Sequence, residues 1–128
     1  IMSAEEAKAA VDAGASGIVV SNHGGRVLDS SAATVEVLPE IAEAVDGACT
    51  VLADGGIRSG ADVFKMLALG ADAVLVGRPI AIAAIGGGAG AVTEEFERLE
   101  DELVHTMVMT GTASLADISA SSLRYSLR

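Results

Sequence analysis

The sequence contains little cysteine, few basic residues and no long apolar run. Cys49 is the single cysteine among 128 residues, which excludes a disulfide framework within the chain and the ligand spacing of a zinc site. Eight lysine and arginine residues stand against 18 aspartate and glutamate residues, and the net charge of −10 argues against nucleic-acid binding, which needs a basic face. Apolar runs stay well below the ~18 residues of a membrane span. Because no targeting segment is evident either, we expect a protein of the reducing cytoplasm.

Apolar residues are nevertheless abundant, at 51% of the chain, and the length suits one domain. They lie in short strand-like runs and in alanine-rich helical stretches. Strands that are apolar on both faces are typical of a parallel sheet that is covered on both sides. The acidic residues fall along the helical stretches, where we interpret them as solvated helix faces. The surplus of apolar surface suggests a piece of a larger protein, with further chain covering it.

The spacing of the apolar residues predicts an alternation of helices and strands. Strands are expected over residues 17–21, 50–53 and 73–76. Helices are expected between Ser3 and Gly14, between Ser59 and Gly70, and over residues 34–45, 80–85 and 93–109. A short helical turn over 115–118 precedes a tail from residue 120.

Several residues constrain the course of these helices. Pro39 is expected in the first turn of its helix or at the start of the regular part of that helix, because a proline deeper inside breaks the hydrogen-bond ladder. Gly86-Gly87-Gly88 is expected to be a flexible connector between the short helix and the last long helix. That last helix should pack through one apolar stripe, made of Phe96, Leu99, Leu103 and Met107.

The order of the elements is α-β-α-β-α-β-α-α, and repeated βα units imply a parallel sheet with right-handed crossovers. The sheet is either part of a closed barrel or an open doubly wound sheet. Three features favour the barrel. Each strand ends in a polar loop, each helix carries one apolar stripe, and a short extra helix follows the last strand, where barrels often bind phosphate. The sequence therefore predicts an α/β fold with about three βα units of a barrel.

The loop Ser21-Asn22-His23-Gly24-Gly25-Arg26 follows the first strand and carries candidates for chemistry. His23, at the carboxyl end of a strand, is placed for proton transfer. Arg26 offers a planar guanidinium group that suits a carboxylate with two hydrogen bonds. The pair fits a substrate with a transferable proton next to a carboxylate. The alternative is a structural histidine in a turn beside a solvated arginine; His105, in the last long helix, is interpreted as a surface or structural residue.

Two further strand-end loops combine glycine with arginine. In Asp54-Gly55-Gly56-Ile57-Arg58 the glycines permit positive φ and close approach of the backbone to a ligand. Backbone N–H groups there, together with Arg58, suit a phosphate. Gly77-Arg78 begins a helix and adds its dipole and unpaired N–H groups. A glycine pair alone is often a simple turn, but two such neighbouring loops favour a phosphate site. No metal site is expected.

Three motifs in this order carry a resemblance: Ser-Asn-His-Gly-Gly-Arg-x-Leu-Asp, Asp-Gly-Gly-Ile-Arg-x-Gly-x-Asp-Val and Gly-Ala-Asp-Ala-Val-Leu-Val-Gly-Arg-Pro. Together they resemble the FMN-dependent 2-hydroxy-acid dehydrogenase/oxidase family, which includes glycolate oxidase, lactate oxidase, L-lactate dehydrogenase and mandelate dehydrogenase. The resemblance covers residues 1–120 and the C-terminal part of the family. It implies the last strands of a (β/α)8 TIM barrel in residues 1–119, with the N-terminal strands absent, and a tail over 120–128. Val27, where many members have glutamine, and Ser30-Ser31-Ala32, which lacks a common proline, depart from the family pattern.

The resemblance also implies a role for each candidate residue. His23 matches the active-site base that contacts the substrate, and Arg26 matches the arginine that binds the substrate carboxylate. Asp54 matches the catalytic carboxylate that holds the base and stabilises its protonated form. The positions at the FMN cofactor, beside the flavin or at its phosphate, are matched by Ser21, Asp54, Gly55, Gly56, Arg58, Gly77 and Arg78.

By this resemblance the protein is expected to oxidise a small L-2-hydroxy acid to the 2-oxo acid and to form a homo-oligomer. The family's lysine near the flavin and its N-terminal strands lie outside this chain, which is therefore expected to be inactive without the rest of the barrel. Two alternatives stay open. One is another phosphate-binding barrel enzyme, such as type 2 isopentenyl-diphosphate isomerase or an IMP dehydrogenase relative, although the His23–Arg26 pair better suits hydroxy-acid chemistry. The other is a non-catalytic fragment that self-associates through its open sheet edge.

Overall fold

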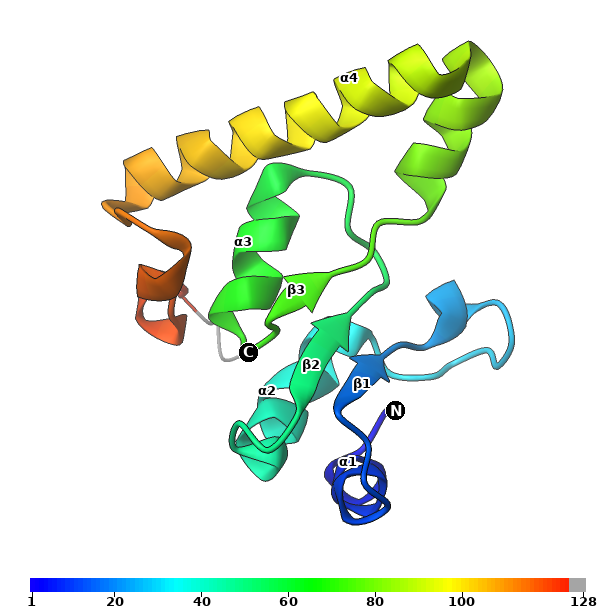
Figure 1. Ribbon diagram of the computed structural model, residues 1–128, viewed down its shortest axis with the longest axis vertical. Helices are drawn as coiled ribbons and strands as arrows, with labels where there is room; N and C mark the ends of the chain where they lie inside the picture. The colour runs from blue at the N-terminus through cyan, green and yellow to red at the C-terminus, as the bar shows by residue number, and fades with distance from the viewer. Residues whose placement is uncertain (125–128) are drawn as a thin grey trace.

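The computed structural model describes residues 1–124 and contains a three-stranded parallel sheet flanked by helices (Figure 1). The strands are β1 (Gly17–Val20), β2 (Thr50–Ala53) and β3 (Ala73–Val74), in the order β1-β2-β3. The helices are α1 (Ala4–Asp12), α2 (Thr34–Val45), α3 (Gly60–Ala68) and α4 (Arg78–Thr110). A helix joins each strand to the next parallel one, which confirms the predicted α/β architecture.

Helices cover one face of the sheet, and the apolar core lies between them. Alternate residues of β1 and β2 are buried on that face: Ile18, Val20, Val51 and Ala53. They form one apolar cluster with residues of α1, α2 and α3. On the other face Val19 pairs in register with Leu52, and Val19 remains 36% exposed. Helices on one face and an uncovered second face are what a segment of a barrel wall presents, because the barrel interior lies on that second face.

Pro39 lies in the interior of α2, so the expectation that it occupies the first turn or starts the regular part of the helix was wrong. The proline ring is exposed, while Leu38, Ile41 and Val45 form a buried stripe. Each of these side chains contributes about 1.5–3 kcal/mol by burial, which outweighs the ~3 kcal/mol that an interior proline costs. The helix therefore continues to Val45 and ends where Asp46 adopts a φ of +47°.

Strand β3 is shorter than the predicted 73–76 and comprises only Ala73–Val74. Its ladder with β2 pairs Leu52 with Ala73 and Ala53 with Val74. Because β2 itself ends at Ala53, pairing stops there except for a bond from the Leu75 N–H to the Ala53 carbonyl (2.9 Å). Residues 75–77 consequently form a loop at the carboxyl end of the sheet.

Helix α4 consists of two helical halves that meet at a kink, where the sequence predicts two helices joined by a glycine connector. Gly86 and Gly87 are helical, and only Gly88 departs, with a φ of +66° and a ψ of −152°. The predicted break between two helices therefore lies within the glycine triplet, at the bend seen in Figure 1, but the non-helical connector is Gly88 alone rather than all three glycines. Phe96 is also outside the buried stripe, since it is 54% exposed while Leu99 is buried against α3. Although α4 has 33 residues, no helix in the described part of the chain has the length and apolar character to cross a membrane.

The chain after α4 turns back toward the core. A 3₁₀ turn over Leu115–Asp117 confirms the predicted helical turn, and a second covers Ala120–Ser122. Leu123 then packs against the apolar cluster. The predicted tail lies partly outside the described residues, at 125–128, and the division at residue 119 stays a prediction.

Candidate active site

Three loops meet at the carboxyl-terminal edge of the sheet, as parallel strands require. They are residues 21–33 after β1, 54–59 after β2 and 75–77 after β3. A cavity of about 400 Å³ lies between them. The predicted site residues that line it are His23, Arg26, Asp54, Gly55, Gly56, Arg58, Gly77 and Arg78. Ser21 is the one predicted site residue outside the lining, and it contacts the site through a hydrogen bond to Asp54.

Asp54 is held by Ser21, which follows the neighbouring strand. Ser21 Oγ donates to Asp54 Oδ2 (2.8 Å) and accepts from the backbone N–H of His23 (3.2 Å). The other carboxylate oxygen, Oδ1 of Asp54, is buried and has no hydrogen-bond partner within residues 1–124. A buried carboxylate oxygen without a donor is costly, which makes it a candidate acceptor for a catalytic group or a ligand.

His23 occupies a 3₁₀ turn, η1 (His23–Gly25), with a left-handed φ of +54°. Asn22 supports this turn, since its Oδ1 accepts from the Gly24 N–H (3.0 Å) and its Nδ2 donates to the Ala32 carbonyl (3.1 Å). A positive φ at a non-glycine residue is strained and concentrates at functional sites. The His23 side chain is exposed, and no hydrogen bond in the described part of the chain joins its imidazole to Asp54. Their predicted pairing therefore stays a prediction.

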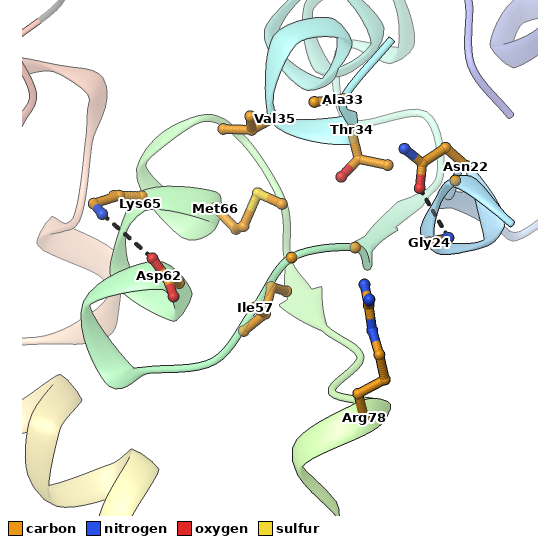
Figure 2. Close-up of a pocket in the computed structure, with 13 residues that line it drawn as sticks. Asn22, Gly24, Ala33, Thr34, Val35, Ile57, Asp62, Lys65, Met66 and Arg78 are labelled. Carbon is orange, nitrogen blue, oxygen red and sulfur yellow. Dashed lines mark hydrogen bonds and ion pairs between the residues drawn. The ribbon is translucent and has the colours of Figure 1, made fainter. Parts of the chain in front are cut away.

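Thr34, the first residue of α2, is a site residue that the sequence analysis missed. Its side chain is 2% exposed, and its Oγ1 donates to the Asp54 carbonyl (2.5 Å). Figure 2 shows Thr34 and Asn22 on the same side of the loop after β2. A Cβ on Gly55, which has a φ of +89°, would lie 3.0 Å from Thr34 Oγ1. Threonine at a helix start is a common capping residue, so nothing in the sequence marks it as a support for Asp54.

The second and third loops form an open, basic end of the cavity. Gly56, with a φ of +78°, and Gly77 have no atom of residues 1–124 within 4 Å of the position of a Cβ, so a ligand can approach their backbone. Arg58 and Arg78 line the cavity with exposed side chains. Figure 2 shows the Arg78 guanidinium extending toward the loop that contains Gly24. Two guanidinium groups beside open backbone N–H groups suit a phosphate, so these residues fit the phosphate of FMN.

Helix α4 begins at this basic end, and Gly77 is its N-cap without a side-chain capping bond. The positive end of the helix dipole therefore faces the cavity. The start of α3 differs, because the Gly60 N–H donates to Glu102 Oε2 (2.8 Å) and the Asp62 N–H to Ser59 Oγ (3.2 Å). The start of α4, and not that of α3, is available to an anion.

A second cavity of about 470 Å³ lies between the loop after β1, α2 and α3 (Figure 2). Arg78, Gly55 and Gly56 line both cavities. His23 and Arg26 line only the first. The first cavity is therefore the candidate active site.

Comparison with known sequences agrees with these features. A family model described as FMN-dependent dehydrogenase matches residues 1–125. An L-lactate dehydrogenase of Serratia proteamaculans (strain 568) is 52% identical over 128 residues, which are 100% of this chain and 34% of that relative. An L-lactate dehydrogenase of Xanthomonas axonopodis pv. citri (strain 306) is 52% identical over 123 residues, which are 96% of this chain and 32% of that relative. The chain thus spans about a third of the length of the curated relatives it matches.

Solved structures show the same partial match. A mandelate oxidase with 3,3-difluoro-2-hydroxy-3-phenylpropionic acid superposes with a TM-score of 0.90 at 51% identity, covering 94% of this chain and 36% of that one. A mandelate oxidase with benzoyl-formic acid gives a TM-score of 0.88 at 52% identity, covering 91% and 35%. These matches confirm the predicted partial barrel. They favour the hydroxy-acid enzymes over the other phosphate-binding barrel enzymes kept as an alternative.

Proposed function

The chain belongs to the family of FMN-dependent dehydrogenases, and from that premise we propose that the intact protein oxidises a small L-2-hydroxy acid to the 2-oxo acid. FMN is the cofactor of this family. The observation that carries the proposal is the one cavity that His23 and Arg26 share with Arg58 and Arg78. It combines a group for proton transfer, a group for a carboxylate and two groups for a phosphate.

The substrate class follows from Arg26 and from the relatives. An exposed guanidinium group beside His23 suits a carboxylate through two parallel hydrogen bonds. The mandelate oxidase structures hold a 2-hydroxy acid in one case and benzoyl-formic acid, a 2-oxo acid, in the other. A 2-hydroxy acid places its hydroxyl-bearing carbon next to the carboxylate, so Arg26 would hold that carbon near His23.

The proton steps are assigned to His23 and Asp54. His23 accepts at an imidazole nitrogen the proton that the substrate releases as it is oxidised. Asp54 Oδ1, which has no donor within residues 1–124, stabilises the imidazolium cation that results. Ser21 occupies Oδ2 and so leaves Oδ1 for this purpose. When bound, FMN would supply the acceptor for the hydride equivalent, two electrons and the second proton, that leaves the substrate.

The cofactor phosphate is assigned to the basic end of the cavity. Arg58 and Arg78 would balance its negative charge, and the open backbone at Gly56 and Gly77 would allow close approach. The start of α4 adds its dipole. The groups assigned to the phosphate and those assigned to the substrate therefore line one cavity, on neighbouring strand-end loops.

We also infer that activity requires the remaining strands of the barrel. The uncovered face of the sheet and its loop expose apolar side chains, with Val19 at 36% and Leu75 at 44%. Closing the barrel would bury this face. The rest of the barrel is thus the proposed partner of this chain, and assembly into a homo-oligomer stays a prediction that a mass measurement in solution tests.

His23→Ala in the intact protein tests the proposed function. We expect the rate at which L-lactate or (S)-mandelate reduces the flavin to fall by about 10²–10⁴-fold, the usual contribution of a positioned acid–base group. The FMN content should not change, because the phosphate residues lie in the other two loops. The reaction is followed by the loss of flavin absorbance after rapid mixing.

His105→Ala is the matched control, since His105 lies exposed on α4, away from the cavity. It should leave the rate unchanged. A wild-type rate in His23→Ala would refute the base assignment. Failure of the wild-type protein to be reduced by either acid would refute the substrate class.

A further inference from the structure

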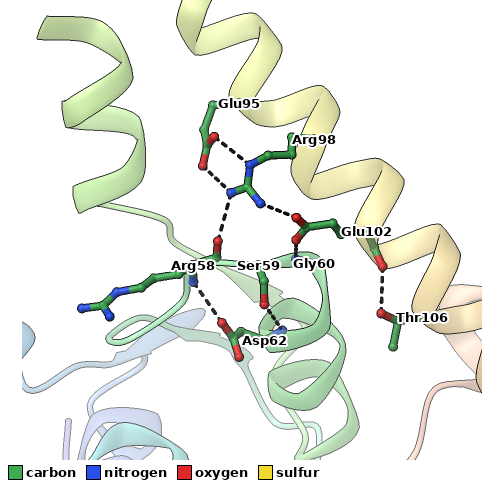
Figure 3. A network of polar contacts seen from close by, with 8 residues as sticks. All are labelled: Arg58, Ser59, Gly60, Asp62, Glu95, Arg98, Glu102 and Thr106. Carbon is green, nitrogen blue, oxygen red and sulfur yellow. Dashed lines mark hydrogen bonds and ion pairs between the residues drawn. The ribbon is translucent and has the colours of Figure 1, made fainter. Parts of the chain in front are cut away.

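Two residues of α4, Arg98 and Glu102, contact the backbone of the loop after β2, which carries Arg58. Arg98 Nη2 donates to the Arg58 carbonyl (3.0 Å), and Glu102 Oε2 accepts from the Gly60 N–H (2.8 Å). Figure 3 shows both side chains extending from α4 onto this loop. The contacts span about forty residues of sequence and join two elements that otherwise meet only by packing.

Arg98 is itself held from both sides. Its Nε and Nη2 donate to Glu95 (2.9 and 2.6 Å), and its Nη1 donates to Glu102. The hydrogen bonds to Glu95 and Glu102 raise the pKa of the Arg98 guanidinium above its ordinary value, and the bond from Arg98 lowers the pKa of Glu95. Both groups therefore stay charged, and these hydrogen bonds fix the orientation of the Arg98 guanidinium group.

The Arg58 backbone is fixed at both of its polar groups. Its N–H donates to Asp62 Oδ2 (3.2 Å) while its carbonyl accepts from Arg98. With the peptide groups on both sides held, the direction of the Arg58 side chain is set by its own rotamer alone. In Figure 3 that side chain points away from the network, and it lines the cavity.

The same helix carries the other phosphate arginine. Arg78 is the first residue of α4, and Arg98 lies in its second half, beyond the kink at Gly88. Helix α4 thus contacts the basic end of the cavity twice, once through a side chain that lines it and once through the backbone of Arg58. Arg98 is 42% exposed, so its ion pairs contribute little stability by themselves, and their main effect is geometric.

We propose that Arg98 and Glu102 are positioning residues that hold Arg58 at a fixed separation from Arg78, so that both guanidinium groups engage one phosphate. This inference rests on the proposed function, since it takes the ligand of Arg58 and Arg78 to be the FMN phosphate. It assigns no contact between Arg98 and the ligand. It predicts that loss of Arg98 weakens binding of the phosphate and leaves binding of the isoalloxazine ring unchanged.

The test compares FMN with riboflavin, which lacks the phosphate, by fluorescence titration of the intact protein after removal of its flavin. In Arg98→Met the preference for FMN over riboflavin should fall about tenfold, the effect of one hydrogen bond to a charged group. Arg98→Lys removes the planar guanidinium group that bonds two carboxylates and the Arg58 carbonyl at once, so the preference for FMN over riboflavin should fall in this variant too. This second variant serves if Arg98→Met does not fold. The control Glu100→Gln changes an exposed charge of the same helix and should preserve the preference.

A double-mutant cycle separates positioning from general destabilisation. Because Arg98 acts through Arg58, Arg98→Met should cause no further loss of preference in an Arg58→Ala background. Equal weakening of FMN and riboflavin in Arg98→Met, or additive losses in the cycle, would overturn the inference. If Arg58→Ala and Arg78→Ala both keep the wild-type preference, the phosphate assignment itself fails. If Arg58→Ala and Arg78→Ala lower the preference for FMN over riboflavin but Arg98→Met and Arg98→Lys do not, only the positioning role is overturned.

Discussion

Gly60→Ala tests the close crossing of α3 over α4, on which the Arg58 loop depends. A Cβ at this position would lie 2.1 Å from the Leu103 backbone nitrogen, 2.4 Å from the Leu99 carbonyl oxygen and 2.5 Å from the Glu102 carbonyl carbon. All three are backbone atoms, so no side chain can rotate away and the helices have to separate. Overpacking of this kind costs about 1–3 kcal/mol, and losing the bond from the Gly60 N–H to the Glu102 carboxylate adds about 1.5 kcal/mol.

Helix propensity acts in the opposite direction but is smaller. Alanine is favoured over glycine by at most ~1 kcal/mol inside a helix, so we expect Gly60→Ala to lower the free energy of unfolding by about 3 kcal/mol. Gly90→Ala is the matched control, because Gly90 is helical in α4 and has no atom within 4 Å of a Cβ. It should be neutral or stabilising. Urea unfolding of the intact protein measures both, and a Gly60→Ala protein as stable as the wild type would refute the crossing geometry.

Two other changes test the kink of α4 at Gly88 and the contacts of Asp62 with the loop after β2. Gly88→Ala places a Cβ on a backbone conformation that is nearly restricted to glycine (φ +66°, ψ −152°), so it should lower the free energy of unfolding by about 1–3 kcal/mol. Gly86→Ala, at an open helical position, is the control and should not lower it. Equal melting temperatures of the two variants would contradict the kink. Burial tends to raise the pKa of Asp62, but hydrogen bonds from Ser59, the Arg58 N–H and Lys65 outweigh it, so the pKa is lowered from 3.8. Its ionised form therefore stabilises the fold above the unfolded pKa, and this contribution is lost as the pH falls through the folded pKa. The stability advantage of the wild type over Asp62→Asn should shrink below about pH 4, and an advantage that persists in acid would contradict the assignment.

The candidate residues of the cavity were recognisable from the sequence because each follows an apolar strand. Parallel strands bring their carboxyl ends to one edge, so His23, Asp54 and Arg78 had to come close once the strands were identified. The supporting residues were not recognisable in this way. Glu102 was interpreted as part of a solvated acidic face, yet it accepts the Gly60 N–H across 42 residues of sequence. The spacing of apolar residues along a helix distinguishes its buried face from its polar face, but it does not show which other element a polar residue contacts.

The local features of this protein were predictable from its residue pattern. Apolar spacing gave the strands and most of the helices, and the strand-end motifs placed the basic and acid–base groups. Short-range interactions decide these features, so they can be derived from neighbouring residues. Only the three-dimensional structure showed that β3 ends at Val74 and that Pro39 is accommodated within α2. It also decided the contacts of Thr34 with Asp54 and of Arg98 with Arg58. Each of these depends on groups distant in sequence, whose packing energy outweighs the local preference.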